Sequence, residues 1–99
     1  MSTLRAEDTI SLSKQSVWCD LNGEVAILHV SSGVYFGLEG AGVSIWQFLQ
    51  EPRTVSQIID HLLASFDVTE DVCERLTLNF LGELAAKDLI LVQAHVAVT

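Results

Sequence analysis

Residues 17–30 read VWCDLNGEVAILHV, and this stretch decides the fold. Asn22-Gly23 stands between two runs that are rich in β-branched and other apolar residues. Asn-Gly is the strongest short signal for a two-residue hairpin, because both residues tolerate a positive φ. The stretch therefore predicts two antiparallel strands joined by a tight turn.

Pairing Leu21 with Glu24 across this turn fixes which side chains share a face of the hairpin. One face then carries two cross-strand pairs, Val17 with Leu28 and Cys19 with Ala26. We predict that this face is directed toward the core. Consistent with it, Cys19 and Cys73 are expected to be buried small apolar residues, since two cysteines 54 positions apart make neither a disulfide framework nor a thiolate metal site.

The opposite face of the hairpin carries Trp18, Val25 and Ile27, and it is more apolar than a surface in contact with water usually is. Something is therefore expected to cover it. Three covers stay open: the N-terminal segment around Ile10 and Leu12, the tail AHVAVT at residues 94–99, or a second copy of the chain, which would make a homodimer.

A third strand is predicted after the hairpin, because the turn residues Ser31-Ser32-Gly33 lead into the aromatic run VYFGL at residues 34–38. It would complete a three-stranded meander, with one edge left unpaired. Natural proteins usually protect such an edge with charge or proline, and this run has neither before Glu39.

The period of the apolar residues changes from strand to helix after Gly40. A first helix is expected up to Pro52, and residues 54–57, TVSQ, match the capping box that begins a second helix. A third and longest helix is expected from residues 67–69 to about Lys87, followed by a short strand or packed tail at residues 89–92. One face of that third helix is apolar through Cys73, Thr77, Phe80, Leu81 and Leu84, whereas Val72 and Leu76 lie to one side of it.

The chain is thus expected to be an α+β protein, a three-stranded antiparallel sheet followed by three helices, in a single domain over residues 1–99. It has 13 acidic against 5 basic residues and a net charge of −8. This charge repels phosphate backbones and anionic lipids, so we expect no nucleic-acid and no membrane partner. Without a bilayer-length apolar run or a signal peptide, a cytoplasmic location is expected.

No catalytic or metal-binding motif is found in the sequence. His29, His61 and His95 fall in three different segments, and no two of them have metal-ligand spacing on one helix. The glycines between residues 37 and 42 lack the β-α-β context of a phosphate-binding loop. We therefore expect a protein that is not an enzyme and needs neither a metal nor a cofactor.

Two structural features remain as signals of a function: an unpaired aromatic strand at residues 34–38 and a displaced apolar stripe at Val72 and Leu76. A peptide that added to the strand edge would satisfy its N–H and C=O groups, and side-chain pockets between sheet and helix would select its sequence. The alternative is that Tyr35 and Phe36 are ordinary core and rim residues, and that the stripe packs under the loop before the third helix.

Several short motifs, in this order and spacing, resemble the PqqD-like family. They are GVYFGLE at residues 33–39, GVSIW at 42–46, RTV at 53–55, FLGEL at 80–84 and DLI at 88–90, within a similarity that spans about residues 9–92. The resemblance implies a winged helix-turn-helix-like fold and a recognition element that binds the leader segment of a ribosomally made (RiPP) precursor peptide. It is most similar to the stand-alone proteins of lasso-peptide biosynthesis, in which a separate leader protease and a cyclase do the chemistry.

In that family the leader pairs with the third strand of the meander and packs on the third helix. The resemblance therefore implies nine peptide-binding residues: Val34, Tyr35, Phe36, Gly37, Val72, Leu76, Asn79, Phe80 and Glu83. Many relatives carry an aspartate near the position of Leu76. An apolar residue here implies a leader with an apolar anchor.

Three rival functions stay open. A winged helix could bind DNA through its third helix, but the exposed positions of that helix are mostly acidic. The family also serves quinone-cofactor and radical-enzyme pathways as a peptide chaperone. Finally, the chain could be a structural subunit that dimerises through the face of Trp18.

Overall fold

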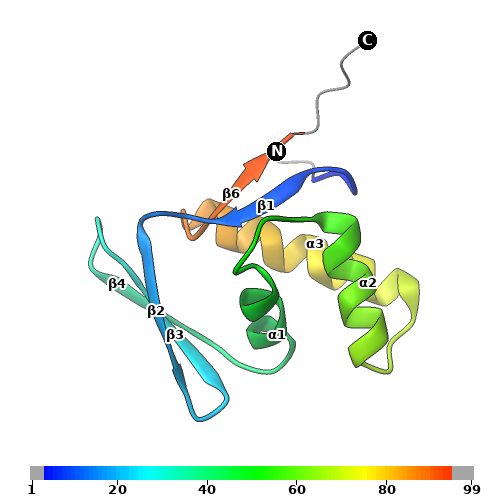
Figure 1. Ribbon diagram of the computed structural model, residues 1–99, viewed down its shortest axis with the longest axis horizontal. Helices are drawn as coiled ribbons and strands as arrows, with labels where there is room; N and C mark the ends of the chain where they lie inside the picture. The colour runs from blue at the N-terminus through cyan, green and yellow to red at the C-terminus, as the bar shows by residue number, and fades with distance from the viewer. Residues whose placement is uncertain (1–3, 95–99) are drawn as a thin grey trace.

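The computed structural model describes residues 4–94 of the chain as an α+β fold with two small sheets and three helices (Figure 1). Four strands come first: β1 (Thr9–Leu12), β2 (Ser16–Leu21), β3 (Glu24–His29) and β4 (Val34–Leu38). They are followed by α1 (Ala41–Phe48), β5 (Arg53–Thr54), α2 (Val55–Ser65), α3 (Glu70–Ala86) and β6 (Ile90–Gln93). The predicted meander and all three predicted helices are confirmed.

The meander has the predicted register. Strands lie in the order β2-β3-β4, all antiparallel, and Leu21 pairs with Glu24 across the Asn22-Gly23 turn. Both turn residues have positive φ, 55° for Asn22 and 86° for Gly23, as a two-residue hairpin requires. Within residues 4–94 no strand pairs with the outer side of β4, so β4 is an edge strand of the described sheet.

A second sheet, which the sequence analysis did not predict, joins the two ends of the described chain. β1 lies in its centre and pairs with both β5 and β6 in antiparallel register. Ile10 of β1 is fully buried in this position. This sheet holds the end of α3 and the start of α2 at fixed places, because β6 follows α3 and β5 directly precedes α2.

The predicted core face of the hairpin is wrong. Val17 is 57% exposed, Leu21 is 55% exposed and Cys19 is also exposed, whereas Val25 and Ile27 on the other face are buried in the hydrophobic core. Trp18 packs edge to face on Trp46 of α1, with ring centroids 6.4 Å apart. The face that carries Trp18, Val25 and Ile27, which was expected to need a separate cover, is therefore the one that packs on the core.

This result corrects two further expectations. The face of Trp18, Val25 and Ile27 is covered by the chain's own core, so it is not a free dimer contact. Most of the tail proposed as a cover, residues 95–99, lies outside the described residues. Only one of the two cysteines, Cys73, is buried as expected.

The exposure of the two thiols gives a direct check of this face assignment. We expect one thiol of the native protein to react rapidly with a thiol reagent, and the second to react only after denaturation, because Cys73 is buried against α2 and Cys19 is open to solvent. Absorbance of the released chromophore measures both steps. A Cys19→Ser control should lose the rapid phase alone; two slow thiols would contradict the assignment.

Helix starts follow the predicted capping chemistry. Thr54 accepts a hydrogen bond from the Gln57 N–H, and the Gln57 side chain accepts one from the Thr54 N–H, which completes the predicted capping box. Thr69 caps α3 by accepting from the Val72 N–H. Among the helices of residues 4–94, none combines the length and apolar composition needed to cross a lipid bilayer.

Candidate peptide-binding site

The hydrogen-bonding direction of each residue in β3 follows from one contact beyond the end of the hairpin. The Val30 N–H donates to the Gln15 carbonyl, with N and O 2.8 Å apart, next to the pair Ser16–His29. Alternate residues of an antiparallel strand bond to opposite sides. The residues of β3 that bond toward β4 are therefore Val25, Ile27 and His29.

The free side of β4 follows from this alternation. The partners of those three β3 residues are Leu38, Phe36 and Val34, which bond inward to β3. The N–H and C=O groups of Tyr35 and Gly37 therefore point to the outer edge, where no strand of the described part of the chain pairs with them. This edge can accept one more strand.

The side chains of β4 also divide between two faces. Phe36 and Leu38 are half-buried and pack against the core. Tyr35 is 73% exposed and lies on the other face, where it borders a shallow hollow shared with Val17 and Leu28. A Cβ atom placed on Gly37 would meet nothing within 4 Å, so this side of the edge is open.

Helix α3 carries the displaced apolar stripe that its sequence predicted. Its core-facing residues are buried: Cys73, Thr77, Leu81 and Leu84. Beside them Leu76 is 57% exposed, Val72 is also exposed and Phe80 is half-buried. Leu76 is too exposed for the alternative in which it packs under the preceding loop.

Two adjoining apolar hollows lie beside this stripe, and both are bordered by Leu76 and Thr77 of α3, by Ala41 of α1 and by Leu62 of α2. The first hollow extends to the α2–α3 connection and is also bordered by Phe66, Val68 and Cys73. The second lies between α1 and α3 and is also bordered by Gly42, Ile45 and Phe80. Together they make a surface for apolar side chains.

Phe80 links the second hollow to the end of β4. A Cβ atom on Gly42 would lie 3.1 Å from Cζ of Phe80 and 3.8 Å from Cβ of Leu38. The absence of a side chain at Gly42 therefore lets the ring of Phe80 lie close to α1, next to the last residue of β4. Any larger residue there would push the ring outward.

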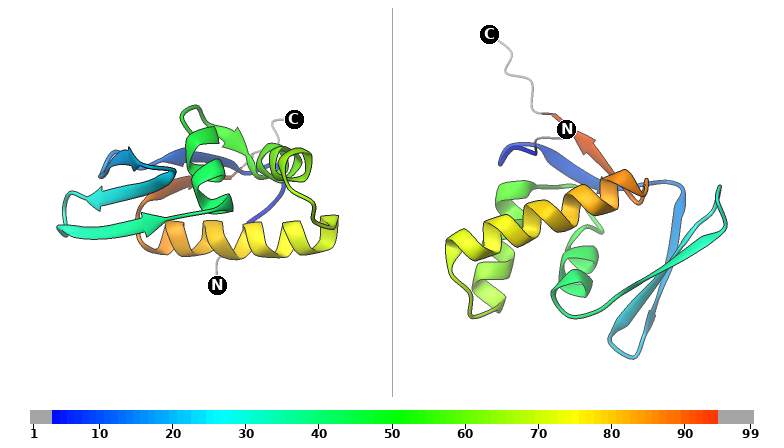
Figure 2. Two further views of the ribbon diagram at one scale, coloured as in Figure 1. Left: turned by 90° about the horizontal axis from the view of Figure 1, so that it is seen from below. Right: turned by 180° about the vertical axis from the view of Figure 1, so that it is seen from behind.

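Just beyond the C-terminal end of α3, the side chain of Lys87 approaches β4. The Lys87 ammonium nitrogen lies 5.3 Å from the ring centroid of Phe36, a cation–π distance. Figure 2 shows β4 and α3 along the same side of the molecule, with the start of α1 between them. We call this surface the β4–α3 groove: the β4 edge with Phe36, the helix residues Leu76 and Phe80, and the two hollows.

The structure brings together only some of the residues that the resemblance implied. Phe36, Leu76 and Phe80 border the groove from strand and helix. Val34, Tyr35 and Gly37 lie on the edge strand, where the last two offer backbone groups. Three others are exposed on α3 and border neither hollow: Val72, Asn79 and Glu83.

Sequence reasoning missed the residues that form the rest of the groove: Ala41, Gly42, Leu62, Phe66, Val68 and Lys87. The small pair Ala41-Gly42 at the start of a helix was a usable signal, because small residues mark places where another element approaches closely. Leu62 and Phe66 gave no such signal, since they fit the apolar stripe of an ordinary core helix.

Comparison with known proteins supplies the family. The family described as "Coenzyme PQQ synthesis protein D (PqqD)" matches residues 24–90, which is more than half of the chain and includes β4, α1 and α3. The chain belongs to the PqqD family. No curated protein matched this PqqD-family chain significantly.

A solved structure is also similar to this PqqD-family chain. It is described as "TbiB1 in Complex with the TbiA(beta) Leader Peptide", and it is 32% identical in sequence with a TM-score of 0.77. The alignment covers 88% of this chain and 99% of that chain. The resemblance expected from the short motifs is therefore confirmed, and so is the α+β fold that it implied.

Proposed function

We propose that this protein binds the leader segment of a ribosomally made precursor peptide in the β4–α3 groove. The leader adds to the sheet as a fourth strand along β4. The Tyr35 and Gly37 backbone groups pair with it, because these are the N–H and C=O groups that face the open edge. The single observation that carries the proposal is this open edge beside two apolar hollows.

An added strand would direct alternate side chains to opposite faces of the sheet. Those on the face of Phe36 would point toward α3 and the hollows, and those on the face of Tyr35 would point away. The leader side chains on the face of Phe36 then determine which leader sequence is bound. Because the hollows border on apolar side chains, Leu76 among them, the leader residues that enter them are apolar.

Charge sets a second condition on the leader. The chain carries a net charge of −8, and Glu83 is exposed on α3 beside the groove. Surfaces of opposite potential associate faster and exclude like-charged partners. The bound leader is therefore basic or neutral next to its apolar anchors.

The wider role of the protein is to present the leader to separate enzymes rather than to catalyse a reaction. The similar solved structure is a complex with a leader peptide, and this supports the same class of partner here. We propose that the pathway makes a lasso peptide in the cytoplasm, with a leader protease and a cyclase as the maturation enzymes.

A second candidate pathway is favoured by the family description, which refers to synthesis of the coenzyme PQQ. In it the protein would be a peptide chaperone for a radical-enzyme or quinone-cofactor pathway. Neighbouring genes distinguish the two. A protease and an asparagine-synthetase-like cyclase indicate the lasso pathway, whereas a radical enzyme indicates the second.

Calorimetric titration tests the proposed function. Synthetic leader peptides from small open reading frames beside the gene are titrated into the full chain. We expect one of them to bind one to one with a dissociation constant in the low-micromolar range or below, and to lose binding when its apolar residues become alanine. If no neighbouring leader binds, the proposed function is wrong.

A further inference from the structure

Asp88 adopts a backbone conformation that aspartate rarely takes. It follows the last turn of α3 with a φ of 59°, in the left-handed region. The Asp88 N–H donates to the Ala85 carbonyl and the Leu89 N–H donates to the Leu84 carbonyl, both at 3.0 Å. These two bonds make a Schellman motif, whose left-handed position is most often glycine because any Cβ is strained there.

The carboxylate of Asp88 has a contact that glycine could not make. Its Oδ2 atom lies 3.0 Å from Nε2 of His29, at the end of β3 and 59 residues earlier in the chain. His29 pairs with Val34, the first residue of β4. The strained residue at the end of the helix thus reaches the strand pair that presents the open edge.

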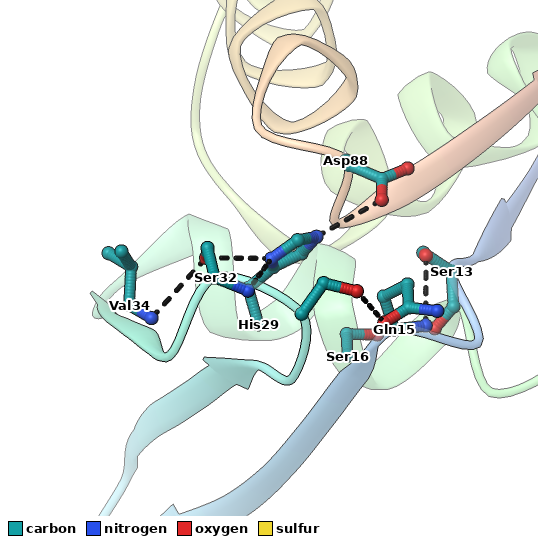
Figure 3. A network of polar contacts seen from close by, with 8 residues as sticks. Ser13, Gln15, Ser16, His29, Ser32, Val34 and Asp88 are labelled. Carbon is teal, nitrogen blue, oxygen red and sulfur yellow. Dashed lines mark hydrogen bonds and ion pairs between the residues drawn. The ribbon is translucent and has the colours of Figure 1, made fainter.

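Ser32 holds the other side of the same imidazole (Figure 3). The Ser32 hydroxyl oxygen lies 2.8 Å from Nδ1, and the Ser32 backbone N–H donates to Nδ1 at 3.3 Å. Nδ1 is therefore the acceptor, which leaves the proton on Nε2 to be donated to Asp88. The ring is fixed from both sides, between the β3–β4 turn and the helix end.

Side chains connect the β2-β3-β4 sheet to α3: Val25 and Ile27 share the buried core with Leu81 and Leu84, and Phe80 lies beside Leu38. The most extensive backbone contacts of the three strands are with one another, and those of α3 are with α2 and β6. Where the groove meets the C-terminal end of α3, two side-chain contacts link the sheet to this helix end: His29 with Asp88, and Phe36 with Lys87. Lys87 and Asp88 are the two residues that directly follow α3. For the first part of β4, Val34 to Phe36, the position relative to α3 thus depends on side chains of this helix end.

We propose that Asp88 and His29 are positioning residues of the leader site, whose hydrogen bond holds β4 at the distance from α3 that the leader requires. This inference rests on the proposed function, and it says which contact sets the width of the groove. In this proposal the Asp88 carboxylate serves binding, although glycine would suit the left-handed position at the helix end better.

The same three side-chain types form the triad of many hydrolases, but their surroundings here differ. A triad serine stands beside a substrate cavity with oxyanion donors. Ser32 lies in the β3–β4 turn, accepts the Val34 N–H at 3.4 Å, and borders neither hollow of the groove. Its contacts fit support of the His29 ring.

The test replaces Asp88 with glycine and measures two quantities in the full chain, the melting temperature and the affinity for the leader that binds the unchanged protein. Asp88→Gly relieves the left-handed strain and removes the bond to His29. We expect an unchanged or higher melting temperature together with at least about fivefold weaker binding. If Asp88 had a merely structural role, its replacement would not weaken binding without also lowering the melting temperature.

Two variants complete the experiment. Asn22→Gly relieves the same kind of strain at the β2–β3 turn, where φ is 55°, and should leave binding unchanged. Asp88→Asn keeps an acceptor for His29 and should recover part of the affinity. If Asp88→Gly binds the leader as tightly as the unchanged protein, the positioning role is wrong and the proposed function stands; if the unchanged protein binds no leader, both fail.

Discussion

Replacing Leu76 with glutamate is expected to weaken leader binding at least about 100-fold. Leu76 borders both hollows of the groove, so its change affects each apolar anchor of the peptide. Burying a leucine side chain stabilises a complex by about 1.5–3 kcal/mol, and a carboxylate in its place must also lose its water. Calorimetric titration with the leader measures the loss.

The control for this change is Leu21→Glu. Leu21 is 55% exposed against 57% for Leu76, but it lies on β2, on the sheet face away from the core. The two variants therefore change charge and exposed apolar area alike. We expect both to keep the circular dichroism of the folded chain and only Leu76→Glu to lose binding. If both variants bind the leader equally well, Leu76 is not part of the binding site.

Proline at Gly37 is expected to weaken binding by at least about tenfold. The Gly37 N–H faces the open edge, and proline lacks this donor while its ring occupies the space of an incoming strand. One lost hydrogen bond costs about 0.5–1.5 kcal/mol, and the steric conflict adds to it. The inward ladder of β4 stays intact, since Phe36 and Leu38 form the bonds to β3.

Gly37→Ala separates the lost donor from the added bulk. A Cβ atom at Gly37 meets nothing within 4 Å, so alanine fits the free protein and keeps the N–H group. We expect its affinity for the leader to stay within about twofold of the unchanged protein. If proline and alanine at this position bind equally well, the leader does not pair with this part of β4.

Local signals predicted the elements of the fold well. Asn22-Gly23 specified the hairpin and its register, and the pair Thr54 and Gln57 specified the start of α2. Each depends on residues within one turn of chain. The second sheet escaped prediction because β5 has two residues and β1 pairs with strands about 45 and 80 residues away, so no turn joins them.

The wrong core face has a different cause. Both faces of the hairpin are apolar, so the alternation of side chains, which usually identifies the buried face, favours neither. The choice depends on Trp18 meeting Trp46 in a helix 28 residues later. A bulky aromatic side chain buries more area than Val17 or Cys19 does, and this contact decides which face turns inward.

The candidate site could be predicted in part. The exposed stripe on α3 followed from helical spacing alone, because Leu76 stands beside a stripe that the core uses fully. The opposite walls of the hollows could not be found in this way. Leu62 and Phe66 border the same hollow as Leu76 only because the chain turns back between α2 and α3, a geometry that periodicity does not encode.

The open edge of β4 also bears on how copies of the protein behave in a crowded solution. Unpaired backbone groups on a strand without proline or charge are a template for aggregation, in which one molecule's edge joins another's. The net charge of −8 opposes such contacts through repulsion between copies, but salt screens that repulsion over about 8 Å at physiological ionic strength. A leader bound along β4 would occupy the free backbone groups and prevent this edge-to-edge association. The precursor peptide would thus protect its own binding protein from aggregation.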